Sequence, residues 1–141
     1  MINSLGTTAV LAATLLAGTP ASAGGLTLTI ENVRSDRGSI IVLVFDNARD
    51  FNRLNYLRAI DYADVPARLG QVEVAFPSLA NGPYAVFLFH DENGDQDLNY
   101  RGERLLEGAG ATGAPNPDDL PSFEEASVLP GSATVILHYD Q

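Results

Sequence analysis

Four segments of the chain carry the apolar pattern of β-strands. Residues 26–30 alternate apolar side chains with threonine, and residues 72–76 place Val72, Val74 and Phe76 at every second position. A period of two residues indicates a strand with one face in the core and the other in solvent. Residues 40–45 and 84–89 are apolar at almost every position, which is typical of a central strand buried on both faces. The pattern therefore predicts at least four strands, two of them central.

The remaining segments are less regular. Residues 47–64 place apolar side chains near helical spacing among Arg and Asp, which indicates a short helix or an irregular crossover. Residues 91–120 are polar, rich in Gly and Pro, and show little periodicity, and we expect two closing strands at 125–129 and 134–139. Short strands without long helices favour an all-β, two-sheet sandwich of about seven strands with one long acidic loop.

The first 23 residues are unlike the rest of the chain. They contain no charged side chain, and the apolar run 9–17 is followed by the small residues Ala21-Ser22-Ala23. This order predicts a secretory signal peptide cleaved after Ala23, which leaves a β-sandwich domain at 24–141. The alternative, a membrane anchor, needs about 20 apolar residues, more than this run supplies. We expect a periplasmic or extracellular protein that is not inserted in the membrane once the signal is removed.

Charge and cysteine content exclude several classes of function. The chain has a net charge of −10 and no cysteine. Nucleic acids and anionic membrane surfaces require clustered basic residues, so neither is an expected partner. The lack of cysteine excludes disulfides and thiolate metal sites. The acidity is also uneven, because residues 24–90 hold 7 acidic and 6 basic residues whereas residues 91–141 hold 11 and 2.

Oxygen-bearing side chains recur at every second position directly after the second central strand. With a possible late ligand, they form a candidate calcium site: Asp91, Asn93, Asp95, Asp97, Asn99 and Glu107. Calcium takes six to eight hard oxygen ligands, whereas magnesium retains water and uses fewer from the protein. The calcium-loop pattern is incomplete, because Gln96 replaces the usual glycine and Gly102 replaces the usual glutamate. The alternative is an Asx-turn loop whose side chains cap their own backbone.

Several motifs along the mature chain resemble those of a family of small exported bacterial proteins of unknown function, whose loop signature is HDxNxNGxLDxN. They cover nearly all of the domain, in this order: Ile30 to Gly38, Val44-Phe45-Asp46, Leu79 with Gly82 and Tyr84, His90 to Asp95, Glu107-Gly108 with Gly110, and Pro121 to Ala126. The resemblance implies an immunoglobulin- or transthyretin-like sandwich and supplies no reaction. This chain departs from the signature at Gln96, Asn99 and Arg101, and the positive charge of Arg101 weakens the metal interpretation.

Catalytic motifs are sparse. His90, Asp91 and Asp95 are the candidate residues of a metal-assisted hydrolase, which is the alternative function. The simpler interpretation is that His90 hydrogen-bonds the loop beside it and that His138 faces solvent or an interstrand partner. The adjacent pairs Asp118-Asp119 and Glu124-Glu125 do not form a glycosidase dyad by themselves, because neighbouring strand residues point to opposite faces.

Tyr84 has an expected structural role. Together with Leu79 and Gly82 it matches a tyrosine-corner turn, in which the phenol ties a crossover to the sheet. The sequence contains no GxSxG nucleophile elbow and no phosphate-binding glycine loop. We therefore expect a non-catalytic binding module for an envelope or extracellular protein or glycan, or a structural accessory subunit of an envelope complex.

Overall fold

The computed structural model describes residues 24–114 and 120–140. The predicted signal peptide, its cleavage site after Ala23 and the pair Asp118-Asp119 lie outside the described residues. Within the described ranges, no helix has the length and apolar character needed to span a membrane.

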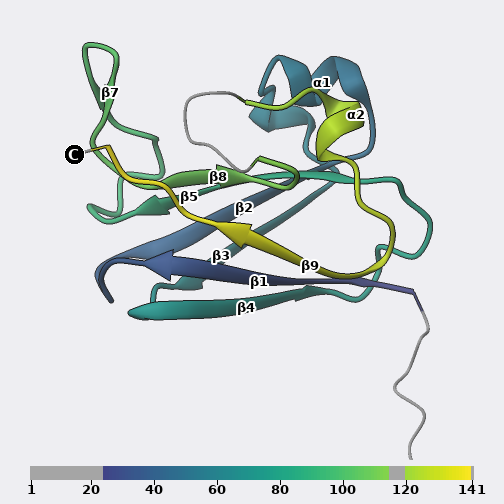
Figure 1. The fold of residues 1–141 in the computed structure, drawn as a ribbon, viewed down its shortest axis with the longest axis horizontal. Coiled ribbons are helices and arrows are strands. Elements are labelled where there is room, and N and C mark those ends of the chain that lie inside the picture. The colour runs from purple at the N-terminus through teal and green to yellow at the C-terminus, as the bar shows by residue number, and fades with distance from the viewer. Residues whose placement is uncertain (1–23, 115–119, 141) are drawn as a thin grey trace, which may run out of the picture.

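Two sheets pack face to face, as Figure 1 shows. The first sheet has the order β4-β1-β9, formed by β1 (Leu26–Val33), β4 (Gly70–Phe76) and β9 (Gly131–Ile136). Its central strand β1 pairs antiparallel with β4 and parallel with β9. The second sheet is antiparallel throughout and has the order β3-β2-β5-β8, formed by β2 (Ser39–Phe45), β3 (Asp61–Pro66), β5 (Ala85–Asp91) and β8 (Ala109–Ala111). The predicted all-β sandwich of about seven strands is confirmed.

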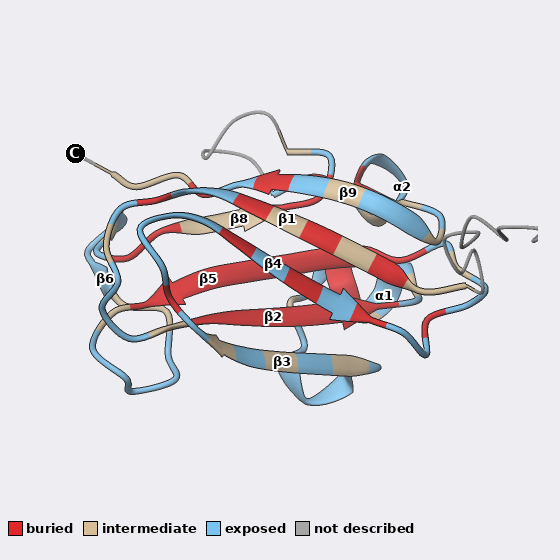
Figure 2. Ribbon diagram, turned by 90° about the horizontal axis from the view of Figure 1, so that it is seen from below, coloured by how far each residue is buried: buried red, intermediate tan, exposed pale blue. Residues whose placement is uncertain are grey.

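The burial pattern follows the apolar periodicity. In β1, Leu26, Leu28 and Ile30 are buried and the threonines between them are half-buried. Every residue of β5 is buried, and so is every residue of β2 after Ser39. Figure 2 shows these two strands as continuous buried ribbons at the centre of the fold. A strand whose apolar and polar residues alternate faces the core on one side only. A strand that is apolar throughout lies between two apolar layers.

The two layers lie on opposite faces of the β2-β5 pair. One is the sandwich interior, which includes Leu28, Val42 and Leu88. The other lies on the outer face of the second sheet, where Phe45, Phe87 and Phe89 pack against short helices and loops. These covering helices are α1 (Ala48–Asn52), η1 (Tyr56–Arg58) and α2 (Phe123–Ala126). Because side chains alternate along a strand, residues next to each other on β5 serve different layers.

Three assignments from the sequence need correction. The closing strand expected at 134–139 is β9, which begins earlier and ends at Ile136. The strand predicted at 125–129 is wrong, because α2 occupies Phe123–Ala126 and only Val128 makes an isolated bridge, to Tyr84. The helix is set by a capping box: the Ser122 side chain accepts a hydrogen bond from the Glu125 backbone at 3.3 Å, and the Glu125 side chain accepts one from the Ser122 backbone at 2.9 Å. A serine followed three residues later by glutamate is the sequence signal for this helix start.

The segment 47–64 is only partly as expected. It contains the short helices α1 and η1, but its end forms the strand β3, which begins at Asp61. The excursion after β5 is also not structureless, since it contains the hairpin of β6 (Tyr100–Arg101) and β7 (Arg104–Leu105) and then β8.

Tyr84 has the structural role expected for it. Its hydroxyl accepts a hydrogen bond from the backbone N–H of Asn81 at 3.1 Å, and its side chain is buried. Its backbone exchanges two hydrogen bonds with Val128, at 2.9 and 2.8 Å. The turn between β4 and β5 is thereby tied to the segment that leads into β9.

Candidate metal centre

Three carboxylates converge where β5 ends and the acidic loop begins. Asp91, Asp95 and Glu107 each offer one oxygen, and these oxygens lie within 4.8 Å of one another. Asp91 is the last residue of β5, Asp95 lies four residues further on, and Glu107 returns after the β6-β7 hairpin. We call these three residues the acidic triad. Such a group of hard oxygen donors could hold a metal ion.

Asp91 and Glu107 are the buried members of the acidic triad, and backbone N–H groups hold both. Asp91 is 1% exposed and accepts hydrogen bonds from the N–H groups of Gly94 at 3.0 Å and Gln96 at 2.8 Å. Glu107 is 4% exposed and accepts from the N–H groups of Glu92 at 3.2 Å and Asn99 at 3.3 Å. The backbone therefore fixes both carboxylates in place but supplies no full positive charge to either.

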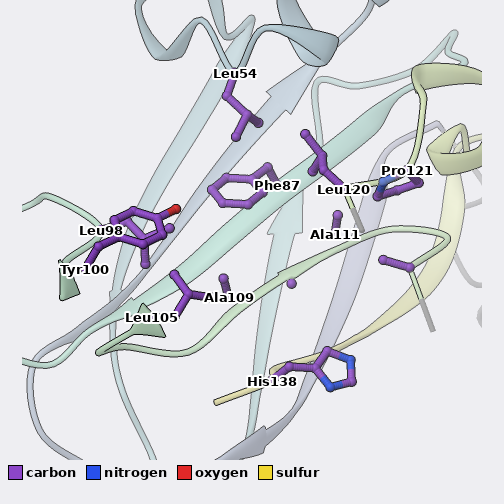
Figure 3. Close-up of a pocket in the computed structure, with 12 residues that line it drawn as sticks. Leu54, Phe87, Leu98, Tyr100, Leu105, Ala109, Ala111, Leu120, Pro121 and His138 are labelled. Carbon is purple, nitrogen blue, oxygen red and sulfur yellow. The ribbon is translucent and has the colours of Figure 1, made fainter. Parts of the chain in front are cut away.

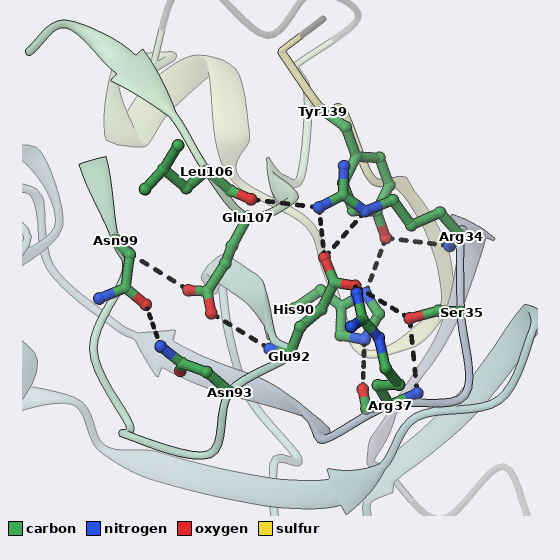
Figure 4. Close-up of polar contacts among 10 residues, drawn as sticks. All are labelled: Arg34, Ser35, Arg37, His90, Glu92, Asn93, Asn99, Leu106, Glu107 and Tyr139. Atoms are coloured by element: carbon green, nitrogen blue, oxygen red, sulfur yellow. Dashed lines mark hydrogen bonds and ion pairs between the residues drawn. The ribbon is translucent and has the colours of Figure 1, made fainter. Parts of the chain in front are cut away.

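Asp95 is exposed and lies at the centre of an amide network. Asn99 donates to its Oδ2 atom at 2.8 Å, and Asn93 donates to the same oxygen at 3.2 Å. The Asn93 amide also donates to the Asn99 Oδ1 atom at 3.1 Å, as drawn in Figure 4. The hydrogen bond from Asn99 is the main reason that the pKa of Asp95 lies below its ordinary value. Turning either amide would exchange its NH₂ group for an oxygen, the atom that a cation accepts.

The electrostatics of Glu107 differ from those of Asp95. Burial raises the pKa of Glu107 above its ordinary value, and the negative charges of Asp91 and Asp95 raise it further. Hydrogen bonds from backbone N–H groups oppose this rise without cancelling it. A buried carboxylate whose neighbours are also carboxylates gains either from a proton or from a cation.

A second carboxylate cluster, centred on Glu92, lies directly beside the acidic triad. Arg34 Nε donates to Glu92 at 2.8 Å, Arg37 donates to its other oxygen at 2.9 Å, and the Ser35 hydroxyl adds a third bond at 3.0 Å (Figure 4). Burial alone would raise the pKa of Glu92, but these three hydrogen bonds outweigh it and hold the pKa below its ordinary value. The guanidinium of Arg34 also lies 4.4 Å above the centroid of the Tyr139 ring.

His90 belongs to this neighbouring network and not to the acidic triad. Its Nε2 atom lies 2.7 Å from the carbonyl oxygen of Arg37, and its Nδ1 atom lies 2.9 Å from the hydroxyl of Tyr139. His90 therefore bonds the turn between β1 and β2 and the C-terminal segment. The expected hydrogen bond to the loop beside it is not formed within the described part of the chain. Because His90 and Asp91 are consecutive on β5, their side chains point to opposite faces of the sheet. A ligand set of His90, Asp91 and Asp95 would require the imidazole to give up at least one of these hydrogen bonds and to reach the face of the sheet that carries Asp91.

The six predicted ligands are thus arranged unequally. Asp91, Asp95 and Glu107 form the acidic triad, while Asn93 and Asn99 contact it through Asp95. Asp97 is exposed, and its described contribution is a backbone N–H that donates to Asp95 at 3.0 Å. Sequence reasoning missed Arg34, Arg37 and Glu92, which carry the ion pairs. Their signal was absent because the partners lie 58 and 55 positions apart along the chain.

The acidic triad lies beside an open depression at the surface. The depression has a volume of about 380 Å³ and is lined by residues of both carboxylate clusters, among them Arg34, Glu92, Asn99 and Glu107. Tyr100 and Leu106 add apolar surface to its edge. An ion therefore has access to Glu107 and Asn99 from solvent.

The comparisons with known proteins identify a family without assigning an activity. No curated protein and no solved structure matches the chain. A family model described as an uncharacterized protein conserved in bacteria matches residues 28–136, which run from β1 to the end of β9. This chain belongs to that family, DUF2141.

Proposed function

We propose that this protein is an exported, non-catalytic binding or accessory module of the bacterial envelope, and that calcium bound by the acidic triad stabilises its long loop. The observation that carries the calcium proposal is the burial of Asp91 and Glu107 without a cationic partner. Among the described residues, both ion pairs go to Glu92 instead. Buried charges in proteins are paired or coordinate metals, so this negative charge favours a bound cation.

The donor set favours calcium over other ions. The acidic triad supplies only carboxylate oxygens, and the adjacent amides of Asn93 and Asn99 can add further oxygens after rotation. Transition metals favour nitrogen or sulfur donors, and the triad brings neither histidine nor cysteine. Flexible loops with several oxygen donors suit calcium, whereas magnesium requires a tighter octahedral arrangement.

The test measures thermal unfolding of the chain from residue 24 onward, with 1 mM calcium and in calcium-free buffer. For the affinities typical of extracellular calcium modules, calcium should add about 0.5–1.5 kcal/mol to the free energy of unfolding. That corresponds to a rise of roughly 2–8 °C in Tm for a domain of this size. Magnesium at the same concentration should have a smaller effect.

Two variants make the assignment specific. Glu107→Gln should lose most of the calcium response, because it removes a buried carboxylate of the acidic triad. Asp36→Asn is the matched control, since Asp36 is an exposed acid in the turn between β1 and β2. An equal calcium response in both variants, or no calcium by elemental analysis of the purified protein, would overturn the calcium proposal.

Export and partner binding rest on different features and need a separate test. Export is supported by the uncharged apolar segment before Ala23, and partner binding by the open depression that combines arginines, carboxylates and Tyr100. Fractionation of cells that express the full chain should give a periplasmic or extracellular protein that begins at Gly24 by mass spectrometry. Co-purification with envelope components supports a binding or accessory role, and a free monomer in every fraction would contradict it.

A further inference from the structure

A second cavity lies on the outer face of the second sheet, and Tyr100 lines both this cavity and the depression beside the acidic triad. It has a volume of about 140 Å³ and is partly open to solvent. Figure 3 shows its floor and walls: Phe87, Ala109 and Ala111 come from β5 and β8, while Leu54, Leu98, Tyr100, Leu105 and Leu120 surround them. The lining side chains are mostly apolar, and Tyr100 and His138 are the polar exceptions.

The size of this cavity limits what it can accept. A cavity of about 150 Å³ lined by aliphatic and aromatic side chains binds benzene in an engineered protein. The cavity beside Phe87 has nearly the same volume, so it fits one six-membered ring. Phe87 already stacks on Tyr56 with centroids 6.2 Å apart, so its ring presents an ordered aromatic surface. Drug-sized molecules would require a larger site.

His138 adds a buried polar atom to the lining. Its Nε2 atom is shielded from solvent and has no hydrogen-bond partner among the described residues. Buried polar atoms are normally paired, so an unpaired imidazole nitrogen at the edge of an apolar cavity needs an explanation. The ring must turn about its Cβ–Cγ bond to meet a ligand, which the broad χ2 preference of histidine permits.

We propose that this cavity binds a small phenol, with the aromatic ring packed beside Phe87 and the hydroxyl paired with His138. A hydroxyl both donates and accepts, so it can pair with either neutral tautomer of the imidazole. An aliphatic amine or a carboxylate would bring an unpaired charge into apolar surroundings and is disfavoured. The site uses none of the carboxylates of the acidic triad, but Leu98, Tyr100 and Leu105 belong to the loop that calcium is proposed to stabilise.

The test is a titration of the ¹⁵N-labelled protein with phenol and, separately, with benzene, followed by NMR chemical shifts. Phenol should give saturable shifts at Phe87, Ala109 and Ala111, with a dissociation constant on the order of 1 mM. Benzene should bind about 3- to 10-fold more weakly, because it leaves the imidazole unpaired. Each titration is run with calcium and in calcium-free buffer, so that failure of the calcium proposal is recognised separately.

Variants decide whether the shifts report this cavity. Ala109→Leu fills it and should abolish phenol binding, whereas Ala75→Leu adds the same side chain at an exposed position of β4 and should not. Leu105→Phe fills the cavity from the hairpin, and it replaces the first variant if that one does not fold. His138→Phe should retain ring binding but lose the preference for phenol over benzene.

Three results would overturn the proposal. The first is the absence of saturable shifts up to 50-fold above the expected dissociation constant. The second is equal phenol binding by Ala75→Leu and a folded cavity-filling variant. The third is an unchanged preference for phenol in His138→Phe, which would remove the role of the imidazole.

Discussion

Glu92 and Glu107 are both nearly inaccessible carboxylates of the same loop, but their surroundings are opposite. The Glu92 side chain is 7% exposed and is bound by Arg34 and Arg37. Glu107 is 4% exposed and has Asp91 and Asp95 beside it. The two glutamates even touch, since the backbone N–H of Glu92 donates to Glu107 Oε1 at 3.2 Å.

This difference shows where the fold supplies its own counter-charge and where it does not. In the Glu92 cluster, the guanidinium groups of Arg34 and Arg37 lower the pKa of Glu92. They also connect the end of β5 to the turn that precedes β2. In the acidic triad, backbone N–H groups hold the carboxylates, but burial and neighbouring charges raise the pKa of Glu107. The first cluster is complete as it stands, and the second is stabilised by a proton or by a cation.

The largest expected effect comes from Asp91→Ala. This variant leaves the N–H groups of Gly94 and Gln96 without their acceptor and removes a ligand from the acidic triad. Hydrogen bonds to charged groups contribute about 1.5–3 kcal/mol each, so the free energy of unfolding in calcium should fall by about 3 kcal/mol. Urea denaturation measures the loss, with Asp36→Ala as the exposed control. A loss below about 1 kcal/mol would show that Asp91 does not organise the loop.

The second prediction separates the two glutamates directly. Glu92→Gln should lower the free energy of unfolding by about 1 kcal/mol, because both arginines are substantially exposed and solvent screens their charge. Its calcium response should remain that of the wild type. Glu107→Gln should lose the calcium response, while its stability without calcium changes little because relief of repulsion offsets the lost acceptor. Equal calcium responses in the two variants would remove the distinction between the clusters.

The third prediction concerns pH in calcium-free buffer. The ordinary pKa of both glutamates is 4.5, and folding raises it for Glu107 and lowers it for Glu92. Folded protein therefore holds the Glu107 proton more tightly, so wild type should gain stability over Glu107→Gln as the pH falls from neutral toward 4.5. For Glu92 the stabilisation is fully present above 4.5 and is lost below it.

Urea denaturation at several pH values measures the difference in free energy of unfolding between wild type and each variant, Glu107→Gln or Glu92→Gln. The contributions of the other titrating groups cancel in this comparison. Calcium should reduce the pH dependence of the stability difference between wild type and Glu107→Gln, because the ion replaces the proton. If that difference does not vary between pH 7 and 4.5, the raised pKa of Glu107 is contradicted.

How much of this the sequence could predict depends on the kind of interaction. The alternation in residues 26–30 and the apolar run in 40–45 predict strands correctly, because these patterns record which side chains face the core. The edge strand β3 was missed because Asp61, Asp64 and Pro66 make its sequence polar. Charge and proline are typical of exposed edges, where they discourage pairing with other chains.

The candidate site was predictable in part. Asp91 and Asp95 follow from the spacing within the loop, and Glu107 was expected only as a possible late ligand, which the hairpin that returns the chain brings to them. The contact of His90 with Tyr139 spans 49 positions, and no local pattern records it. Long-range partners of this kind follow from topology, which a single sequence specifies only weakly.

The smallest expected effect tests the spacing argument itself. Asp97 matches the alternation of the loop as well as Asp95 does, but it is exposed and lies outside the acidic triad. Asp97→Asn should therefore change the stability by less than about 0.5 kcal/mol and leave the calcium response intact. Asp95→Asn is the matched comparison, because it makes the same change two residues earlier and should weaken the response. If Asp97→Asn weakens the calcium response as much as Asp95→Asn does, the ion lies further along the loop than the acidic triad. The spacing in the sequence would then predict the ligands better than the geometry of the structure does.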